Sequence, residues 1–325
     1  MRRKQNGKTV KALVLEKGRL RLKELPMPVP QRDEVLIRVL KAGICNTDLE
    51  LARGYMDFEG VPGHEFVGRV VKAADAKWQG RRVTGEINIA CLECELCQSG
   101  QEKHCPFRKV LGIHRKNGAF AEYLIIPFRN LHLIPQGVTD AEAVFVEPLA
   151  SSLQILKQVH IGKGDSVLIL GDGKLALLAA QVIQERTDRI FCLGKHRRKL
   201  TLLEKRGIRT SLKGQDLRGT FDIVIEATGK KEGIREALAW VKPFGKIVLK
   251  STYRGEVRID ISRIVVDELM LIGSRCGPFP EAIAMLREKK INVVEMIDGD
   301  FPLEKAIEAF SLAEKPETIK VLITP

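Results

Sequence analysis

Four of the seven cysteines in this 325-residue chain fall within fifteen residues, at Cys91, Cys94, Cys97 and Cys105. Thiolates at this density either pair as disulfides or bind a soft metal ion. Disulfides between cysteines three residues apart would close tight, strained loops, and nothing in the sequence indicates an oxidising compartment. A set of four sulfur ligands is typical of a closed, structural zinc site without a position for substrate. The spacing therefore predicts a zinc-binding lobe at residues 88–108, with any chemistry elsewhere.

The length and composition of the chain limit what it can be. A chain of 325 residues exceeds the usual size of one core, so two domains are expected. No segment is long and apolar enough to span a membrane, and the basic start at residues 1–8 leads into no apolar signal core. The net charge of +13 would allow a nucleic-acid partner, but the basic residues are scattered and aromatics make up only 5%. We expect a cytoplasmic protein without a nucleic-acid or membrane partner.

A second set of possible metal ligands lies upstream of the lobe. Cys45, His64 and Glu65 fall within twenty-one residues, with glycine or proline close by to shape their loops. A single cysteine or histidine is more often a core residue than a ligand, but this combination favours a metal site. Glu147 stands in the apolar run 144–150, where a carboxylate needs a cation or a hydrogen-bond network.

From about residue 160 the pattern changes to alternating strands and helices. A short apolar strand at 166–170 is followed by Gly171-Asp172-Gly173-Lys174-Leu175-Ala176 and a helix at 177–186. In this G-x-G-x-x-A pattern Gly171 permits a tight turn and Gly173 lets a pyrophosphate approach the backbone, while the small third residue allows close packing. The sequence predicts a doubly wound parallel sheet that binds a dinucleotide.

The next strand, at 189–193, ends at Gly194, 23 residues after Gly171. Enzymes that use NAD usually carry an acidic residue there, which binds the adenosine ribose. This chain has Gly194 followed by Lys195, His196 and Arg197. The absence of the acid and the added cations favour a 2′-phosphate, and therefore NADP over NAD. The alternative is that the basic run is only the exposed start of a helix.

The remaining segments complete a two-domain plan. Residues 9–42 read as strands with period-two alternation, and further strands of the parallel sheet are expected at 221–229, 246–249 and 269–272. The tail, with helices at 280–289 and 303–315 and a strand at 320–323, is predicted to return to the first domain. We therefore expect domains at 1–150 and 151–275, and a returning segment at 276–325.

Taken together, these motifs resemble the zinc-containing medium-chain dehydrogenase/reductase family, that of alcohol, sorbitol and threonine dehydrogenases. The resemblance covers nearly the whole chain, and its tail and the segment 272–275 are most similar to the sorbitol dehydrogenase branch. It implies a GroES-like, mostly-β catalytic domain and a Rossmann coenzyme domain. The motifs that carry it are residues 43–48, 63–65, the four-cysteine lobe, 147–149, the Gly171 turn and 301–306.

The resemblance also implies roles for individual residues. Cys45 and His64 match ligands of a catalytic zinc, and Glu65 and Glu147 match carboxylates that alternate as its ligands. Thr47 matches the hydroxyl of a proton relay, and Asp48 matches a carboxylate that orients the ligand histidine. The coenzyme residues implied or expected are Gly171, Gly173, Lys174, Leu175, Gly194, Lys195, His196, Arg197, Thr228 and Gly229. Arg275 matches a position that contacts hydroxylated substrates, and homodimers or homotetramers are implied.

The expected reaction is reversible hydride transfer between an alcohol and a nicotinamide coenzyme. One zinc ion per chain polarises the substrate oxygen, Thr47 passes the proton outward, and a second zinc ion is structural. The relay histidine of better-known relatives would lie near Glu50, so the proton must leave by another route. Two alternatives stay open: a zinc-free quinone or enoyl reductase on the same fold, and a non-catalytic protein that binds nucleotide and zinc and contacts RNA.

Overall fold

The structure, a computed structural model, describes residues 8–212, 219–253 and 255–325. Residues 1–7 of the basic N-terminal segment therefore lie outside the described residues. The chain forms two compact units: unit 1 contains the chain up to Glu147 together with Met296–Pro325, and unit 2 contains Pro148–Glu295. The return to unit 1 thus begins at Met296, whereas the sequence pattern placed it at residue 276.

Unit 1 is built on antiparallel strands. A hairpin pairs β1 (Thr9–Glu16) with β2 (Arg19–Pro26), and the inward-facing residues of β1 are buried. The main sheet has the order β10-β5-β4-β3-β18-β17, with β9 also paired to β3. Its strands are β3 (Glu34–Gly43), β4 (Glu65–Lys72), β5 (Arg82–Gly85), β9 (Tyr123–Pro127), β10 (Leu131–Leu133), β17 (Ile297–Pro302) and β18 (Lys320–Thr324). The predicted mostly-β first domain is confirmed.

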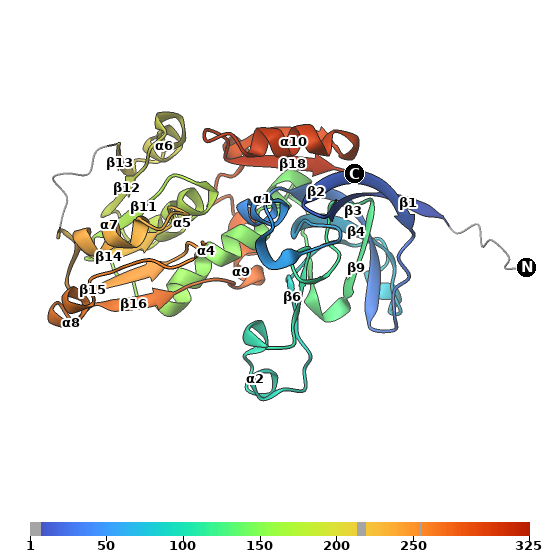
Figure 1. Cartoon of the computed structure of the whole chain (residues 1–325), viewed down its shortest axis with the longest axis horizontal. Coiled ribbons are helices and arrows are strands. Elements are labelled where there is room, and N and C mark those ends of the chain that lie inside the picture. The colour runs from blue at the N-terminus through green and yellow to red at the C-terminus, as the bar shows by residue number, and fades with distance from the viewer. Residues whose placement is uncertain (1–7, 213–218, 254) are drawn as a thin grey trace, which may run out of the picture. The chain divides into compact units, whose positions relative to one another are not determined.

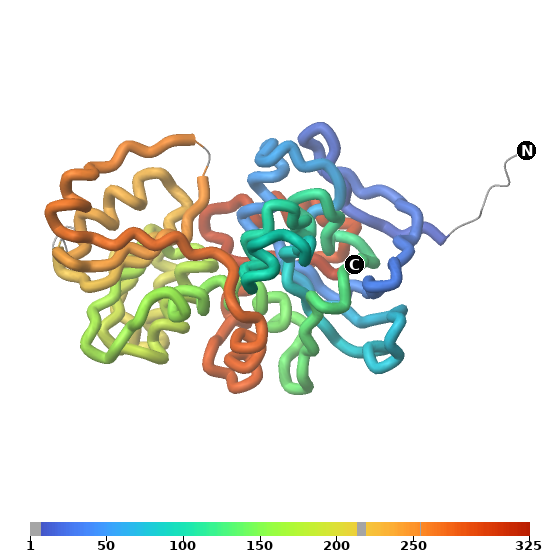
Figure 2. The backbone as a smooth tube through the Cα atoms, turned by 90° about the horizontal axis from the view of Figure 1, so that it is seen from below, coloured from blue at the N-terminus to red at the C-terminus, as the bar shows by residue number. Residues whose placement is uncertain are grey.

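The C-terminal segment of the chain is built into this sheet. Strand β18 pairs antiparallel with β3, placing Leu322 opposite Gly43, and β17 pairs parallel with β18. Helix α10 (Ala306–Ala313) buries Ala306, Ala309 and Phe310 in the core of unit 1. Figures 1 and 2 show this red segment beside the blue N-terminal strands. Side chains near the end of the chain can therefore contribute to a site in unit 1.

The four-cysteine lobe has little regular structure. It contains β6 (Asn88–Ile89) and the short α2 (Glu95–Gln98). Strand β7 (Lys109–Leu111) follows the lobe directly and pairs with β6 and with β8 (Arg115–Lys116). In Figure 1 the lobe extends from β6, away from the main sheet of unit 1. Its own buried cluster consists of Ala90 and the cysteines, so a bound metal would supply most of what holds it together.

Unit 2 is a six-stranded parallel sheet with the order β13-β12-β11-β14-β15-β16. This is the 3-2-1-4-5-6 order of a dinucleotide-binding sheet, with its switch point at β11 and β14. Its strands are β11 (Val167–Leu170), β12 (Ile190–Leu193), β13 (Arg209–Ser211), β14 (Phe221–Glu226), β15 (Val241–Leu249) and β16 (Met270–Gly273). The predicted doubly wound sheet is confirmed.

Helices connect the strands of unit 2. They are α4 (Val146–Gln158, starting in unit 1), α5 (Lys174–Gln184), α6 (Arg197–Glu204), α7 (Gly233–Trp240), α8 (Ile261–Val266) and α9 (Phe279–Arg287). Helix α5 begins three residues before the predicted Leu177, because the extended backbone of Gly173 serves as its N-cap. None of the described helices is long and apolar enough to cross a membrane.

Helix α9 belongs to unit 2 because of its contacts there. Gly277, just before it, lies so close to the Ala150 carbonyl of α4 that a side chain would collide. Lys157 and Glu281 form an ion pair, and Gln181 of α5 exchanges two hydrogen bonds with the backbone of Asn292. These contacts, which the sequence pattern could not reveal, place 276–295 with unit 2.

Candidate metal and coenzyme sites

Two groups of described residues could each hold a metal ion, and both were predicted from the sequence. In the first, the ligand atoms of Cys45, His64 and Glu65 all lie within 4.8 Å of one another. Cys45 precedes α1 (Asn46–Ala52), and Glu65 is the first residue of β4, paired with Gly43 on β3. Sulfur, imidazole nitrogen and carboxylate oxygen are all zinc ligands, and three protein ligands are typical of a catalytic site.

Asp48 links the two loops that carry these ligands. Its Oδ2 accepts the backbone N–H of Cys45 at 2.8 Å, and its Oδ1 accepts that of Gly63 at 3.2 Å. The same Oδ1 lies 3.3 Å from Nδ1 of His64, the residue that Asp48 is expected to orient. Burial alone would lower the pKa of His64, but the charge of Asp48, followed by hydrogen bonds to Asp48 and Cys45, raises it well above its usual value. Because only the neutral imidazole can bind a metal ion, protonation of His64 and metal binding compete at this site.

A lysine that the sequence analysis missed completes this site. Lys320 of β18 is fully buried, and its ammonium group is ion-paired with the Glu65 carboxylate. The ammonium also lies 5.6 Å from the centre of the Phe145 ring, and it donates to the Ile44 carbonyl at 3.3 Å. Gly43 has to lack a side chain because a Cβ there would collide with the end of Lys320. Burial lowers the pKa of Lys320 to about 8, although the charges of Cys45 and Asp48 act in the opposite direction.

The other predicted residues of this site have different positions. Thr47 is half-buried, with its Oγ1 3.9 Å from the Cys45 sulfur. Glu147 is half-buried in the first turn of α4 and is not part of the described Cys45–His64–Glu65 group. Of the two carboxylates expected to alternate as ligands, the structure thus brings only Glu65 to the cysteine and the histidine.

The second group consists of Cys91, Cys94, Cys97 and Cys105. Their closest sulfur–sulfur distances are 3.4 Å for Cys94–Cys97 and 3.5 Å for Cys91–Cys105, and Cys94–Cys105 measures 3.8 Å. A tetrahedron with zinc–sulfur bonds of 2.3 Å has edges of about 3.8 Å, whereas a disulfide requires about 2.05 Å. All four cysteines are free thiols, so the arrangement fits zinc rather than disulfides.

The thiols of the lobe differ in acidity. The backbone N–H groups of Glu93 and Cys94, in that order, are the main causes that lower the pKa of Cys91 to about 6. Burial, followed by the hydrogen bond with Cys94, raises the pKa of Cys97 to about 12. The lowered pKa of Cys91 favours a thiolate at this position, the form of cysteine that binds metal ions.

In unit 2, the glycine-rich turn has the conformation that its motif predicts. Gly171 follows β11 with φ +113°, and a Cβ there would lie 2.5 Å from the Ala227 carbonyl. Gly173 has open space on its Cβ side, and Lys174 and Leu175 open helix α5. The turn thus leaves room for a pyrophosphate at the N-terminus of α5.

Asp172, between the two glycines, was not singled out from the sequence. It is 8% exposed, and its Oδ2 accepts the backbone N–H groups of Lys195 and His196 at 2.5 and 2.6 Å. The His196 ring Nδ1 lies 3.0 Å from the same oxygen. Burial would raise the pKa of Asp172, but the N–H groups of His196 and Lys195 lower it, so the carboxylate is ionised at neutral pH. A carboxylate therefore contacts the loop after β12, although Gly194 carries none.

The basic side chains of this loop differ in whether they form an ion pair within the protein. Lys195 is exposed, and no ion pair of it occurs among the described residues. Arg197 is exposed as well, but its guanidinium is paired with Glu204 at 2.8 Å. Lys195 is thus the cation of the loop most available to an anionic ligand.

Thr228 and Gly229 form a turn directly after β14, at the carboxyl edge of the sheet. The buried Glu226 holds this turn: its Oε1 accepts from the backbone N–H and the hydroxyl of Thr228 at 2.9 and 2.6 Å, and from Ser251 at 2.9 Å. The Gly229 N–H donates in turn to Ser251 at 2.7 Å. The turn is therefore fixed before any ligand binds.

Arg275 follows β16 at the same edge, and its side chain is exposed. Its carbonyl accepts hydrogen bonds from Ser151 at 2.6 Å and from the buried Lys250 at 3.3 Å. Lys250 also donates to the carbonyl and the hydroxyl of Ser151. The backbone that carries Arg275 is thus anchored to α4, a contact that the sequence did not indicate.

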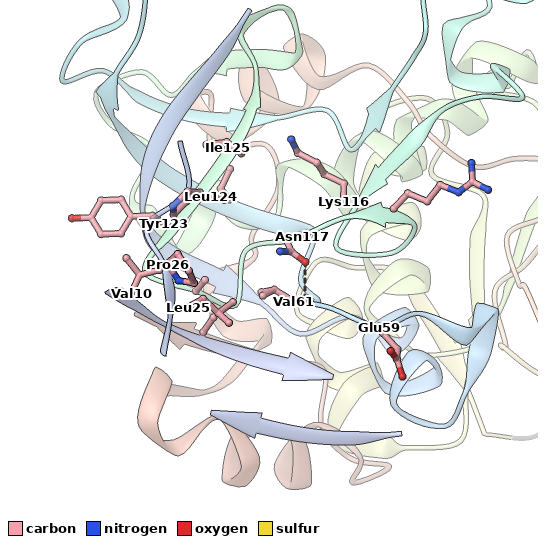
Figure 3. Close-up of a pocket in the computed structure, with 15 residues that line it drawn as sticks. Val10, Leu25, Pro26, Glu59, Val61, Lys116, Asn117, Tyr123, Leu124 and Ile125 are labelled. Carbon is pink, nitrogen blue, oxygen red and sulfur yellow. Dashed lines mark hydrogen bonds between the residues drawn. The ribbon is translucent and has the colours of Figure 1, made fainter. Parts of the chain in front are cut away.

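A hollow of about 330 Å³ elsewhere in unit 1 does not have the character of a ligand site (Figure 3). Its apolar lining includes Val10, Leu25, Val61 and Leu124. Figure 3 shows Tyr123, Glu59 and Lys116 pointing in three different directions, so its polar groups do not converge. The side-chain oxygen of Asn117 is used to accept the Val61 N–H at 3.1 Å.

Comparison with known proteins agrees with this geometry. Residues 31–136 match the alcohol dehydrogenase GroES-like domain, and residues 142–324 match the family described as glucose dehydrogenase C-terminus. Together these two matches span both units of the structure. They confirm the GroES-like and Rossmann domains that the resemblance implied.

Individual proteins are similar over almost the whole chain. A sorbitol dehydrogenase of Halalkalibacterium halodurans is 28% identical, over 95% of this chain and 96% of its own. A zinc-binding dehydrogenase of Sinorhizobium meliloti bound to NADP has a TM-score of 0.90 and 29% identity, covering 98% of this chain and 100% of its own. An alcohol dehydrogenase of Escherichia coli complexed with NADH also has a TM-score of 0.90, with 26% identity and the same coverage. The chain therefore belongs to the zinc-containing medium-chain dehydrogenase/reductase family, the alcohol dehydrogenase family of oxidoreductases.

Proposed function

We propose that this protein is a zinc-dependent alcohol dehydrogenase that transfers a hydride reversibly between a hydroxylated substrate and a nicotinamide coenzyme. The observation that carries the proposal is the convergence of Cys45, His64 and Glu65, with Asp48 beside the histidine. A zinc ion held by these three residues would supply Lewis-acid polarisation of the substrate oxygen. The four-cysteine lobe would hold a second, structural zinc ion.

The residues around the site would orient its ligands and move the proton. Asp48 fixes the Nδ1 side of His64, which leaves the other ring nitrogen for the metal. Thr47, half-buried beside the Cys45 sulfur, is the hydroxyl placed to take the substrate proton and pass it on. Glu65 would supply the third ligand, and Lys320 balances the charge of its carboxylate. Glu147 would be the carboxylate that replaces Glu65 as a metal ligand during turnover.

The substrate would be a polyol or another hydroxyl-rich alcohol. Two features support this: the similarity to a sorbitol dehydrogenase, and the exposed Arg275 on an anchored backbone. An arginine at that position can donate to several hydroxyl groups or to an anionic group. Turnover of a panel of simple alcohols, polyols and phosphorylated polyols tests the assignment, and Arg275→Ala should raise KM for the preferred substrate without changing the zinc content.

The coenzyme would be NADP in preference to NAD. Gly194 offers no carboxylate to the adenosine ribose, and Lys195, His196 and Arg197 lie directly after it, with Lys195 outside any described ion pair. Gly171, Gly173 and the start of α5 would hold the pyrophosphate, and Thr228 and Gly229 the nicotinamide ribose. Titration of both coenzymes tests this: Lys195→Ala with Arg197→Ala should abolish the difference in Kd.

Metal analysis separates this function from its alternatives. Two zinc ions per chain, falling to one in Cys45→Ser together with loss of alcohol oxidation, are expected for the dehydrogenase. A chain with no zinc that reduces quinones or enoyl compounds would be the zinc-free reductase. Zinc and nucleotide binding without turnover, combined with salt-sensitive RNA binding, would indicate the non-catalytic protein. Cys45→Ser with full zinc content and full activity would exclude the proposed site.

We propose a homodimer or homotetramer in the cytoplasm. Strand β16 is the last strand of its sheet, and Met270 on it and Val265 and Val266 on α8 are 56%, 68% and 79% exposed. An unpaired strand edge beside exposed apolar side chains is a surface that a second copy could cover. Val266→Asp should then lower the mass measured by light scattering. The seven cysteines all lie in the part of the chain that the structure describes and form no disulfide there, which agrees with a reducing compartment.

A further inference from the structure

The connection between β12 and α6 contains an occupied anion-binding position. Two consecutive backbone N–H groups, of Lys195 and His196, point at one carboxylate oxygen of Asp172, at 2.5 and 2.6 Å. Successive N–H groups that converge in this way are a common means by which proteins bind phosphate and other anions. Here the anion is a side chain of the protein itself, supplied by the glycine-rich turn.

Asp172 also explains why residue 194 is a glycine. A Cβ at Gly194 would lie 2.7 Å from both Cβ and Oδ2 of Asp172, and 2.8 Å from a methyl group of Leu200. An acidic side chain at position 194 would therefore force the side chains of Asp172 and Leu200 to shift. Gly194 supplies no carboxylate at the end of β12, but Asp172 of the glycine-rich turn supplies one there instead.

In dinucleotide-binding sheets, the end of the second strand is where the 2′ position of the adenosine ribose is recognised, by an acid for NAD or by cations for NADP. Because the N–H groups of Lys195 and His196 follow Gly194 directly, they lie at that position in the fold. We propose that Asp172 is a specificity-determining residue whose carboxylate occupies the anion position that the 2′-phosphate of NADP would otherwise take. This inference rests on the coenzyme site proposed above.

The negative charge of Asp172 therefore opposes the attraction that the neighbouring cations exert on a 2′-phosphate. Lys195 attracts a 2′-phosphate, whereas Asp172 repels it and withholds two backbone donors from it. His196 lies on the same carboxylate through Nδ1, which holds its ring against Asp172. The wild-type protein should thus bind NADP less strongly than its basic loop alone would allow, and NAD should be little affected.

Removal of the carboxylate tests the inference. Asp172→Ser empties the position and leaves the two N–H groups to the ligand, while Asp172→Asn keeps the volume and removes only the charge. We expect the ratio of Kd for NAD+ to Kd for NADP+ to rise about tenfold or more in Asp172→Ser, the size of one charge-assisted hydrogen bond. Asp172→Asn should raise the ratio by less, because its carboxamide still fills the position.

The controls use the full-length, zinc-loaded protein. Asp188→Asn makes the same charge change at an exposed position of unit 2 and should leave the ratio unchanged. Circular dichroism and a thermal melt establish that each variant is folded, and Asp172→Asn decides if Asp172→Ser does not fold. A ratio that stays the same or moves toward NAD+ in a folded variant overturns the role of Asp172 alone. A wild-type protein that binds neither nucleotide overturns the coenzyme site, and this inference with it.

Discussion

The ammonium group of Lys320 is fully buried and paired with the carboxylate of Glu65, a residue of the candidate zinc site. Lys320 stands on the last strand of the chain, and Glu65 opens the strand after the histidine loop. Cys45, Asp48 and Glu65 are all acidic groups, so a zinc ion alone would not balance their charge. Lys320 supplies the remaining positive charge and keeps Glu65 in place while the metal is absent.

Lys320→Met should therefore destabilise the zinc-free protein strongly. Breaking a buried pair by removing one partner leaves an uncompensated charge, which costs about 3–5 kcal/mol. The loss of unfolding free energy should be smaller in the zinc-loaded protein, because the metal ion can neutralise the Glu65 carboxylate. Urea unfolding of both forms measures the difference. Lys320→Arg, which keeps the charge, should recover part of the stability; equal losses with and without zinc would contradict this role of Lys320.

Asp48→Asn should weaken zinc binding at the Cys45 site. The carboxylate faces Nδ1 of His64, and loss of such an orienting partner typically costs about 10- to 100-fold in metal affinity or activity. Competition with a chromogenic chelator measures the release of zinc from each site. The four-cysteine lobe serves as an internal control, because its release should be unchanged. Equal release rates in the variant and the wild type would show that Asp48 only caps α1.

Cys94→Ser should remove the structural zinc ion without removing the chemistry. The lobe has a buried cluster of only Ala90 and its cysteines, so without the metal little holds it in place. We expect one zinc ion per chain, faster proteolytic cleavage within residues 88–108, and alcohol oxidation that persists. Mass spectrometry of the fragments locates the cleavage. Complete loss of turnover in a folded variant would show that the lobe contributes to the reaction.

Asp222 should contribute stability that is lost in acid. Burial would raise the pKa of this carboxyl, but the hydroxyl and N–H of Ser166, and then Lys242, lower it to about 2. The unfolded value is about 3.9, so the stabilisation is complete above that pH and disappears as the pH falls toward 2. Asp222→Asn should flatten the fall of unfolding free energy between pH 4 and 2, measured by urea unfolding. Asp188→Asn, at an exposed site, should not.

The sequence by itself determined the two-domain plan and the residues of both candidate metal sites. Local patterns carried these predictions: the cysteine spacing, the G-x-G-x-x-A turn after an apolar strand, and the close succession of Cys45, His64 and Glu65. Such signals need only neighbours along the chain, because turn geometry and ligand spacing are set locally. The structure accordingly brings each of these groups together as predicted.

Only the tertiary structure decided which charged side chains, far away along the chain, contact the candidate metal ligands and the coenzyme loop. Lys320 reaches Glu65 because β18 pairs with β3, and Asp172 reaches the Lys195 loop because β11 and β12 lie side by side. Helix α9 joins unit 2 through contacts with α4 and α5, which moves the return to unit 1 to Met296. A lysine or an aspartate carries no local sign of its partner, since ion pairs between strands depend on register rather than on spacing along the chain. The four-cysteine metal site could be predicted from the sequence. The charged residues that contact Glu65 and the Lys195 loop could not.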